Sequence, residues 1–235
     1  MSTFVLVHGA WHGGWCWSRV ARILRARGHA VTTPTQTGVG EKSHLLSRDI
    51  TLTTFGEDIV NHLRFEELSD VVLVGHSFGG ASISYAAEKA RDRVSRLVYL
   101  DAAVILAGET PLSSKPPEMA ALRRQLAEDH DGGLSLPPPP ALVMGITQAE
   151  DAAWIERMMT PHPFNTMDTP LEITGQPGAG LPAEYIKCAD PVYDPLANDR
   201  ERARGFGWPM RQIAAGHDCM ISAPEALADL LEAAP

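Results

Sequence analysis

Cysteine is scarce in this chain. Its 235 residues include three cysteines, Cys16, Cys188 and Cys219, which are odd in number and widely spaced. A disulfide framework of the secreted kind uses many closely spaced cysteines, so this pattern predicts reduced thiols in the cytoplasm. Cysteine and histidine also do not cluster at the spacing of zinc ligands, and we expect no metal site.

Long apolar runs and an excess of positive charge are also missing. Phe4–Val7 is too short for a signal-peptide core and has no basic start, and no run approaches membrane-spanning length. The chain has 20 Lys and Arg against 29 Asp and Glu, a net charge of −9, which argues against nucleic acid and anionic membranes as partners. We expect a cytoplasmic protein that acts on a small molecule, with monomer and homodimer both left open.

What the chain does have is an alternation of strand-like and helix-like segments. Predicted helices follow most of the predicted strands, at Trp17–Arg27, Leu52–Leu63 (with Thr54 as N-cap), Ala81–Ala87 and Pro224–Leu231. The predicted strands are Phe4–Val7, Ala30–Thr33, Val71–Val74, Arg96–Leu100, Glu184–Cys188 and Met210–Ala214. This order predicts the α/β class, with six mostly parallel strands and helices on both faces of the sheet.

One segment breaks the alternation. Between the fourth and fifth predicted strands, prolines such as Pro111, Pro116 and Pro137–Pro140 separate short helical pieces at Met119–Ala127 and Glu150–Met159. We interpret residues 104–180 as a helical cap inserted into a core of residues 1–103 and 181–235. In a parallel sheet the functional groups belong at the carboxyl ends of the strands, which such a cap would cover.

The third predicted strand runs into Gly75-His76-Ser77-Phe78-Gly79, a G-x-S-x-G pattern between a strand and a helix. This context is typical of a nucleophile elbow, a tight strained turn that exposes a serine at the end of its strand. The helix that follows directs its free N–H groups toward the site. Ser77 is therefore the predicted nucleophile.

A serine hydroxyl needs a base, and the base needs an acid that orients it. His217 follows the last predicted strand, after Gly216, and is the predicted base. Asp190, which follows the fifth predicted strand, is the first choice for the acid, with Asp194 and Asp101 as alternatives. Asp218 is adjacent to His217 in sequence, and neighbouring side chains rarely point at each other.

The loop after the first strand, His8 to Trp15, is rich in glycine and lets backbone approach a substrate. With the N–H of Phe78, the N–H of Ala10 is the predicted second donor of an oxyanion hole. We expect the substrate to contact Trp11, His12, Trp154 and Met158.

Three segments together carry a resemblance: His8–Trp17, Gly75–Gly80 and Gly216-His217. The chain resembles the α/β-hydrolase superfamily, and within it the group of small methyl esterases and hydroxynitrile lyases. The resemblance implies the α/β-hydrolase fold with a helical cap and no cofactor. The family acid usually lies three residues after the position of Cys188, where this chain has Pro191, so Asp190 is one residue early.

The resemblance also separates two reactions. Cyanohydrin-cleaving members place Thr at the position of Gly9, Glu at that of His76 and Lys at that of Asp218. An Asp beside the base would repel a developing cyanide. All three differences favour a serine esterase acting on a small or aryl carboxylic ester through an acyl-enzyme. The alternatives are a hydroxynitrile lyase, cleavage of a C–C, amide or thioester bond at the same site, and a non-catalytic receptor.

Overall fold

The computed structural model describes residues 1–233, so the last two residues of the predicted core segment lie outside it. One sheet of six strands forms the centre of the molecule, in the order β2-β1-β3-β4-β7-β8, and every neighbouring pair is parallel. This confirms the predicted α/β class and strand number. The strands are β1 Thr3–Val7, β2 Ala30–Thr32, β3 Val71–His76, β4 Val94–Leu100, β7 Ala183–Cys188 and β8 Met210–Ile213.

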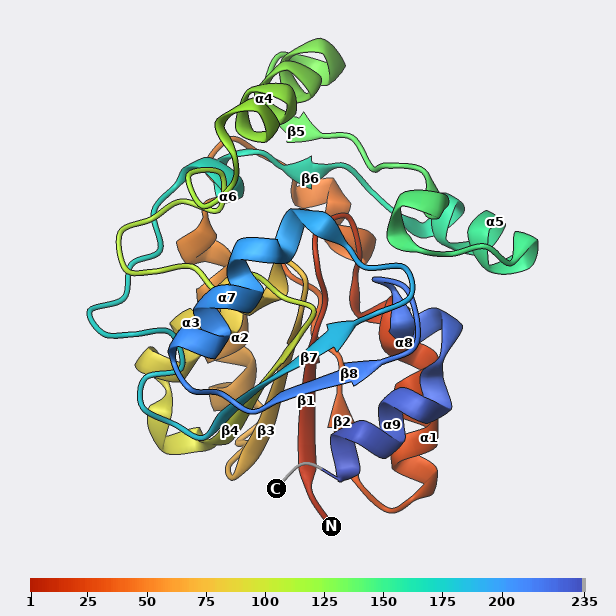
Figure 1. Cartoon of the computed structure of the whole chain (residues 1–235). Coiled ribbons are helices and arrows are strands. Elements are labelled where there is room, and N and C mark those ends of the chain that lie inside the picture. The colour runs from red at the N-terminus through yellow and green to blue at the C-terminus, as the bar shows by residue number, and fades with distance from the viewer. Residues whose placement is uncertain (234–235) are drawn as a thin grey trace.

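The central strands read as unbroken apolar runs because helices cover both faces of the sheet. All six residues of β3 are buried, and Val74 pairs with Leu6 on one side and Val98 on the other. Figure 1 shows helices against both faces of the sheet. Helices α1 Ser18–Ala26 and α9 Pro224–Glu232 lie on one side, and α2 Leu52–Phe65 and α3 Gly79–Lys89 lie on the other.

The ends of two helices can be traced to single residues. Gly28 follows α1 with φ +89°, a conformation that glycine adopts without strain, as predicted for a helix stop. The predicted cap of α2 at Thr54 is one turn too late. Thr51 is the N-cap: its hydroxyl accepts from the Thr54 N–H, and the Thr54 hydroxyl accepts from the Thr51 N–H.

The segment between β4 and β7 lies across the carboxyl ends of the strands (Figure 1). Its two short strands pair antiparallel in a small sheet that the sequence did not predict. The elements of the segment are α4 Pro117–Asp131, β5 Ser135–Leu136, the 3-10 turn Ala141–Met144, α5 Ala149–Met158, β6 His162–Pro163 and α6 Asn165–Asp168.

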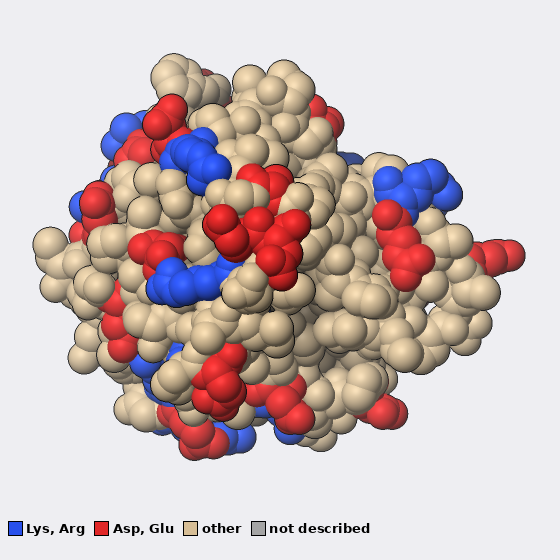
Figure 2. Space-filling view, turned by 90° about the horizontal axis from the view of Figure 1, so that it is seen from above, with Lys and Arg blue, Asp and Glu red and all other residues tan. Residues whose placement is uncertain are grey.

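Helix α7, Ala197–Gly205, follows β7 and packs against it, and it was also not predicted. The remaining short elements are α8 Cys219–Ser222 and the 3-10 turns Gly14–Trp17, Gly40–Leu45, Arg91–Arg93 and Asp194–Leu196. Within residues 1–233, no helix combines the length and the apolar character that crossing a bilayer requires. Seen from above the cap, Lys and Arg side chains lie singly or beside Asp and Glu rather than in one broad patch (Figure 2).

Candidate active site

The turn between β3 and α3 places Ser77 at the carboxyl edge of the sheet. Ser77 has φ +53°, a left-handed conformation that is strained for a residue with a side chain. The backbone is held on both sides: the Ser77 N–H donates to the Leu100 carbonyl (3.2 Å), and the Ser77 carbonyl accepts from Ala103 (2.8 Å). At Gly79 a Cβ would come within 2.7 Å of the His8 carbonyl oxygen, so this turn closes only with glycine.

His217 lies beside Ser77 and is almost completely buried, at 2% exposure. Its Nε2 is 2.9 Å from the Ser77 Oγ, and its Nδ1 is 2.8 Å from Oδ2 of Asp101. Because a carboxylate only accepts, Nδ1 carries the proton and Nε2 is left to accept from the serine hydroxyl. The structure thus brings the predicted nucleophile and base together in the tautomer that general-base chemistry needs.

The carboxylate that is hydrogen-bonded to His217 belongs to Asp101. The prediction that Asp190 orients the histidine is therefore wrong. Asp101 directly follows β4, has φ +38° and is fully buried, and its N–H donates to the Ile186 carbonyl at 2.7 Å. Asp190 is exposed: its N–H donates to the Ala215 carbonyl, and the loop after β7 turns its side chain to solvent. Asp194 is exposed as well.

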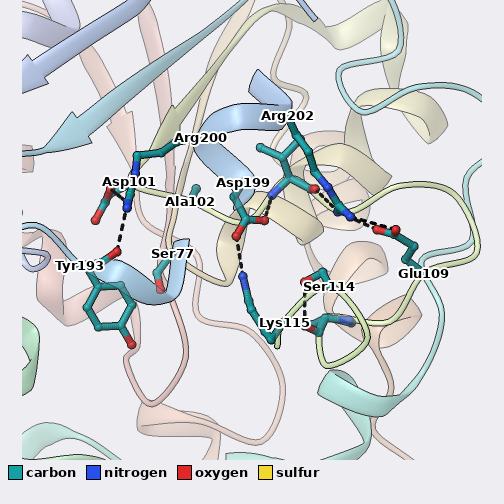
Figure 3. Close-up of polar contacts among 12 residues, drawn as sticks. Ser77, Asp101, Ala102, Glu109, Ser114, Lys115, Tyr193, Asp199, Arg200 and Arg202 are labelled. Atoms are coloured by element: carbon teal, nitrogen blue, oxygen red, sulfur yellow. Dashed lines mark hydrogen bonds and ion pairs between the residues drawn. The ribbon is translucent and has the colours of Figure 1, made fainter. Parts of the chain in front are cut away.

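A buried arginine completes the environment of Asp101. Arg200, on α7, places its guanidinium 3.5 Å from the other carboxylate oxygen of Asp101 and donates to the Tyr193 carbonyl at 3.0 Å (Figure 3). The Tyr193 ring stacks on the His217 ring, with centroids 4.0 Å apart and planes at 18°. Arg200 therefore balances the charge of the acid and fixes the loop whose aromatic ring covers the base.

The residue before Arg200 links α7 to the cap. Asp199 is buried, accepts from the Val104 N–H at 2.8 Å and pairs with Lys115 at 2.5 Å (Figure 3). Burial lowers the pKa of Lys115, and Asp199 offsets part of that effect. Arg202, one turn further, pairs with Glu109 and donates to the Val104 carbonyl. The end of β4, helix α7 and the start of the cap are thus joined by charged groups.

A second buried pair holds the predicted oxyanion loop. His12 donates from Nδ1 to the Ala10 carbonyl (2.7 Å) and from Nε2 to Asp218 (3.0 Å). Burial favours neutral His12, but the carboxylate beside it raises its pKa overall; burial likewise opposes ionised Asp218, whose pKa His12 brings below its ordinary value. His12 is 1% exposed, so it orients the Ala10 peptide rather than contacting substrate as predicted.

The other histidines near the site are neutral. His76 donates from Nε2 to the His217 carbonyl at 3.0 Å, and burial holds its pKa well below its ordinary value. Burial also lowers the pKa of His8 to about 3. Its Nδ1–H donates to the Gly9 carbonyl and its Nε2 accepts from the Gln36 N–H. His8 therefore fixes the start of the same loop without a charge.

Above Ser77 is a small cavity, partly open to solvent. Within residues 1–233, the N–H groups of Ala10 and Phe78 donate to no protein acceptor, and both residues line this cavity. Two free donors beside the nucleophile are what an oxyanion hole requires. The full lining is Ala10, Trp11, Ser77, Phe78, Ala103, Pro111, Lys115, Arg123, Met167, Tyr193, Pro195 and Leu196.

Only some of the residues predicted to contact the substrate line the cavity. Trp11 lines the cavity, but Trp154 and Met158 do not. Trp154 packs edge-on against Trp15 at 5.4 Å and lies under the Arg19 guanidinium. The walls that were missed come from the cap and from the loop between β7 and α7, segments without a sequence pattern that predicts which side chains face inward.

A model of the alpha/beta hydrolase family matches residues 4–230. This chain belongs to the alpha/beta hydrolase family. A carbendazim hydrolyzing esterase from Nocardioides sp. (strain SG-4G) is 38% identical to this alpha/beta hydrolase over 242 residues, covering 99% of both chains. Pheophorbidase from Raphanus sativus is 32% identical over 246 residues, covering 95% of this chain and 90% of its own.

Solved structures agree with this assignment. An extracellular alpha/beta-hydrolase from a Paenibacillus species shares the fold, with a TM-score of 0.83 and 24% identity over 98% of both chains. A pyrethroid hydrolase gives a TM-score of 0.72 with 25% identity, covering 99% of this alpha/beta hydrolase and 96% of that chain. The resemblance inferred from the sequence is confirmed.

Proposed function

We propose that this alpha/beta hydrolase is a carboxylic ester hydrolase that works through an acyl-enzyme on Ser77, with small or aryl esters as substrates. The observation that carries the proposal is the hydrogen-bonded series Ser77, His217 and Asp101, with separations of 2.9 and 2.8 Å, at the base of a cavity. Relatives named as esterases, at 38% and lower identity, support the same reaction class.

In the first half of the reaction, the Ser77 Oγ attacks the ester carbonyl carbon while its proton passes to Nε2 of His217. The carbonyl oxygen becomes an oxyanion, which the free N–H groups of Ala10 and Phe78 stabilise without reorganising. Asp101 balances the imidazolium that forms. The intermediate then collapses, and the alcohol leaves with the proton from His217.

In the second half, water attacks the acyl carbon, His217 takes the proton of the water, and a second oxyanion forms in the same place. When this intermediate collapses, the Ser77 Oγ takes the proton back and the carboxylic acid leaves. His217 thus acts as base and acid in turn, which requires that its ring keep one orientation. The stacked Tyr193 ring and the Asp101 carboxylate fix that orientation.

Two features oppose cyanohydrin cleavage. Asp218 is the residue after His217, and it is a carboxylate buried against His12, where a lyase of this family has a cation. At Gly9, a Cβ would lie 2.7 Å from the Cβ of Ser77, so the threonine of the lyases does not fit this backbone. Both positions support ester hydrolysis.

The test measures hydrolysis of 4-nitrophenyl acetate by the wild type and by Ser77→Ala, with the exposed Ser18→Ala as matched control. Loss of the nucleophile is expected to reduce kcat by about 10⁴-fold or more, and Ser18→Ala is expected to change nothing. A fluorophosphonate should label the wild type at Ser77, as shown by peptide mass spectrometry. Full esterase activity in Ser77→Ala overturns the proposal.

Two alternatives remain measurable in the same preparation. Cleavage of mandelonitrile faster than of any ester would make the protein a lyase, and no turnover together with no fluorophosphonate labelling would make it a receptor. We also propose that the protein works in the cytoplasm on a small-molecule ester. Its three cysteines are free and buried, which supports a reducing compartment.

A further inference from the structure

The cavity above Ser77 continues into a larger apolar groove on the cap. Four residues line both spaces and therefore form the junction between them: Trp11, Arg123, Tyr193 and Pro195. Beyond the junction, the walls include Leu122, Leu126, Pro137–Pro140 and Val143. Leu122 and Val143 are 57% and 49% exposed, so this apolar surface is open to a ligand.

The charges around the cavity balance in pairs with one exception. Lys115 is paired with Asp199, and Arg200 with Asp101. Arg123 makes no ion pair with any carboxylate of residues 1–233, although its neighbour Arg124 pairs with Asp168. The junction therefore carries one unbalanced positive charge in a protein whose net charge is −9.

The Arg123 charge affects the pKa values of titratable side chains near the cavity. It contributes to lowering the pKa of Lys115 and of His162, although burial is the larger cause for both. Burial raises the pKa of Tyr193, and the nearby guanidinium opposes that rise. Arg123 and the Tyr193 hydroxyl are thus neighbouring hydrogen-bond donors at the junction, and guanidinium binds carboxylates in a bidentate geometry.

We infer that the preferred substrates are anionic, elongated esters. The reacting ester group and a small substituent occupy the cavity, an apolar body lies in the groove, and a carboxylate on that body meets Arg123 at the junction. This inference rests on the proposed function, because it assigns the substrate class of the same site. The anion is remote from the bond that breaks, so its binding energy is the same in ground and transition states and appears in KM rather than kcat.

The experiment compares matched esters that differ in one charge. On the acyl side the pair is mono-4-nitrophenyl suberate and 4-nitrophenyl octanoate; on the alcohol side it is 4-acetoxybenzoate and 4-acetoxyacetophenone. The variants are Arg123→Gln, which removes the charge, Arg123→Lys, which keeps it, and Arg124→Gln as the matched control on the same helix. A Leu126→Ser variant probes the groove.

In at least one pair the wild type should prefer the anionic ester. Arg123→Gln should raise KM for that ester about tenfold. Its kcat for that ester, and both constants for the neutral ester, should change by no more than about twofold. Arg123→Lys should keep most of the preference for the anionic ester, and Arg124→Gln should keep all of it. The preference should weaken as salt is added. Leu126→Ser should raise KM for the octanoate ester several-fold and leave KM for 4-nitrophenyl acetate unchanged, because only the longer chain reaches the groove.

Equal effects of Arg123→Gln on both members of each pair, or no preference in the wild type, overturn the inference. If Ser77→Ala is inactive in that case, the proposed esterase function stands and only the substrate class is wrong. If Ser77→Ala keeps its activity, the proposed function itself fails. The two failures are therefore distinguishable within one set of measurements.

Discussion

Replacing Asp101 by asparagine tests the assignment of the acid most directly. We expect Asp101→Asn to lower kcat for 4-nitrophenyl acetate by about 10⁴-fold, and Asp190→Asn to leave it within about twofold. The first residue is fully buried and 2.8 Å from Nδ1 of His217, and the second is exposed. The two substitutions are the same in chemistry and differ only in position.

The magnitude follows from the hydrogen bond that the carboxylate makes. With Asp101 ionised, Nδ1–H must point at it, and Nε2 is free to accept the proton of Ser77. An amide at position 101 can donate to Nδ1 instead, which stabilises the tautomer with its proton on Nε2 and removes the base. It also loses the charge that stabilises the imidazolium. A 10⁴-fold loss corresponds to about 5.4 kcal/mol of transition-state stabilisation.

The substitution also leaves Arg200 without its carboxylate. Arg200 is 6% exposed, and an uncompensated buried cation costs roughly 3–5 kcal/mol of folding free energy. Loss of activity must therefore be separated from loss of fold. The double variant Asp101→Asn with Arg200→Met removes both charges together; it should recover much of the stability while kcat stays low.

The assay combines kcat from initial rates, the burst amplitude of 4-nitrophenol and a urea titration for each variant. Asp101→Asn should unfold at a lower urea concentration than the wild type. Without urea it should remain folded and have a low kcat. The reasoning is refuted if Asp190→Asn loses about 10³-fold or more while Asp101→Asn keeps its activity. That outcome would mean that the loop after β7 rearranges in the working enzyme and brings its own carboxylate to His217.

Two further changes test the loop that holds Ala10, one of the two predicted oxyanion donors. Gly9→Ala should reduce kcat about 10²-fold, because the new Cβ would lie 2.7 Å from the Cβ of Ser77. Measuring both kcat and a thermal unfolding curve will distinguish a displaced Ser77 from an unfolded protein. Asp218→Asn should cost roughly 3–5 kcal/mol in a urea titration. The wild-type contribution of the His12–Asp218 pair is lost as pH falls through the depressed pKa of Asp218 and as pH rises through the raised pKa of His12. The stability of Asp218→Asn should therefore change less with pH, and an identical pH dependence in both proteins would count against the charged pair.

The sheet and the elbow could be predicted from sequence because their signals are local. A buried parallel strand such as Val71–His76 is an apolar run bounded by turn residues, and Ser77 is recognised by the glycines that its tight turn needs. His217 follows from the rule that the base comes after the last strand. None of these inferences needs knowledge of contacts between distant segments.

Helix α7 was missed because its sequence carries no helical apolar pattern. Ala203 is its one fully buried apolar side chain, while Asp199 and Arg200 are buried and charged. Charged residues are usually solvated, so the segment reads as a loop. Its partners, Lys115 and the end of β4, lie more than 80 residues away in sequence, and charges become acceptable in the interior only when such partners are in place.

The acid was misassigned because chain order does not separate the candidates: Asp101 and Asp190 both lie between Ser77 and His217, and each follows a predicted strand. One signal pointed to Asp101. It is a lone carboxylate within the run from Leu97 to Ile105, where the other residues are apolar. A carboxylate in a buried stretch needs a hydrogen-bonding or charged partner, so its isolation in the sequence predicts a partner elsewhere in the structure.

The position of the proposed acid at the end of β4 has a consequence for the rest of the site. Strand β4 is hydrogen-bonded to β3, and Ser77 bonds to Leu100 and Ala103 on either side of Asp101, so nucleophile and acid are held at fixed separation by one ladder. The loop after β7 therefore does not position the proposed acid. In this alpha/beta hydrolase it carries Tyr193 over the base, and Pro195 into the cavity wall. In the proposed mechanism, an acid at the end of the neighbouring strand separates the chemistry, which the sheet positions, from the substrate contacts that we expect from that loop and the cap.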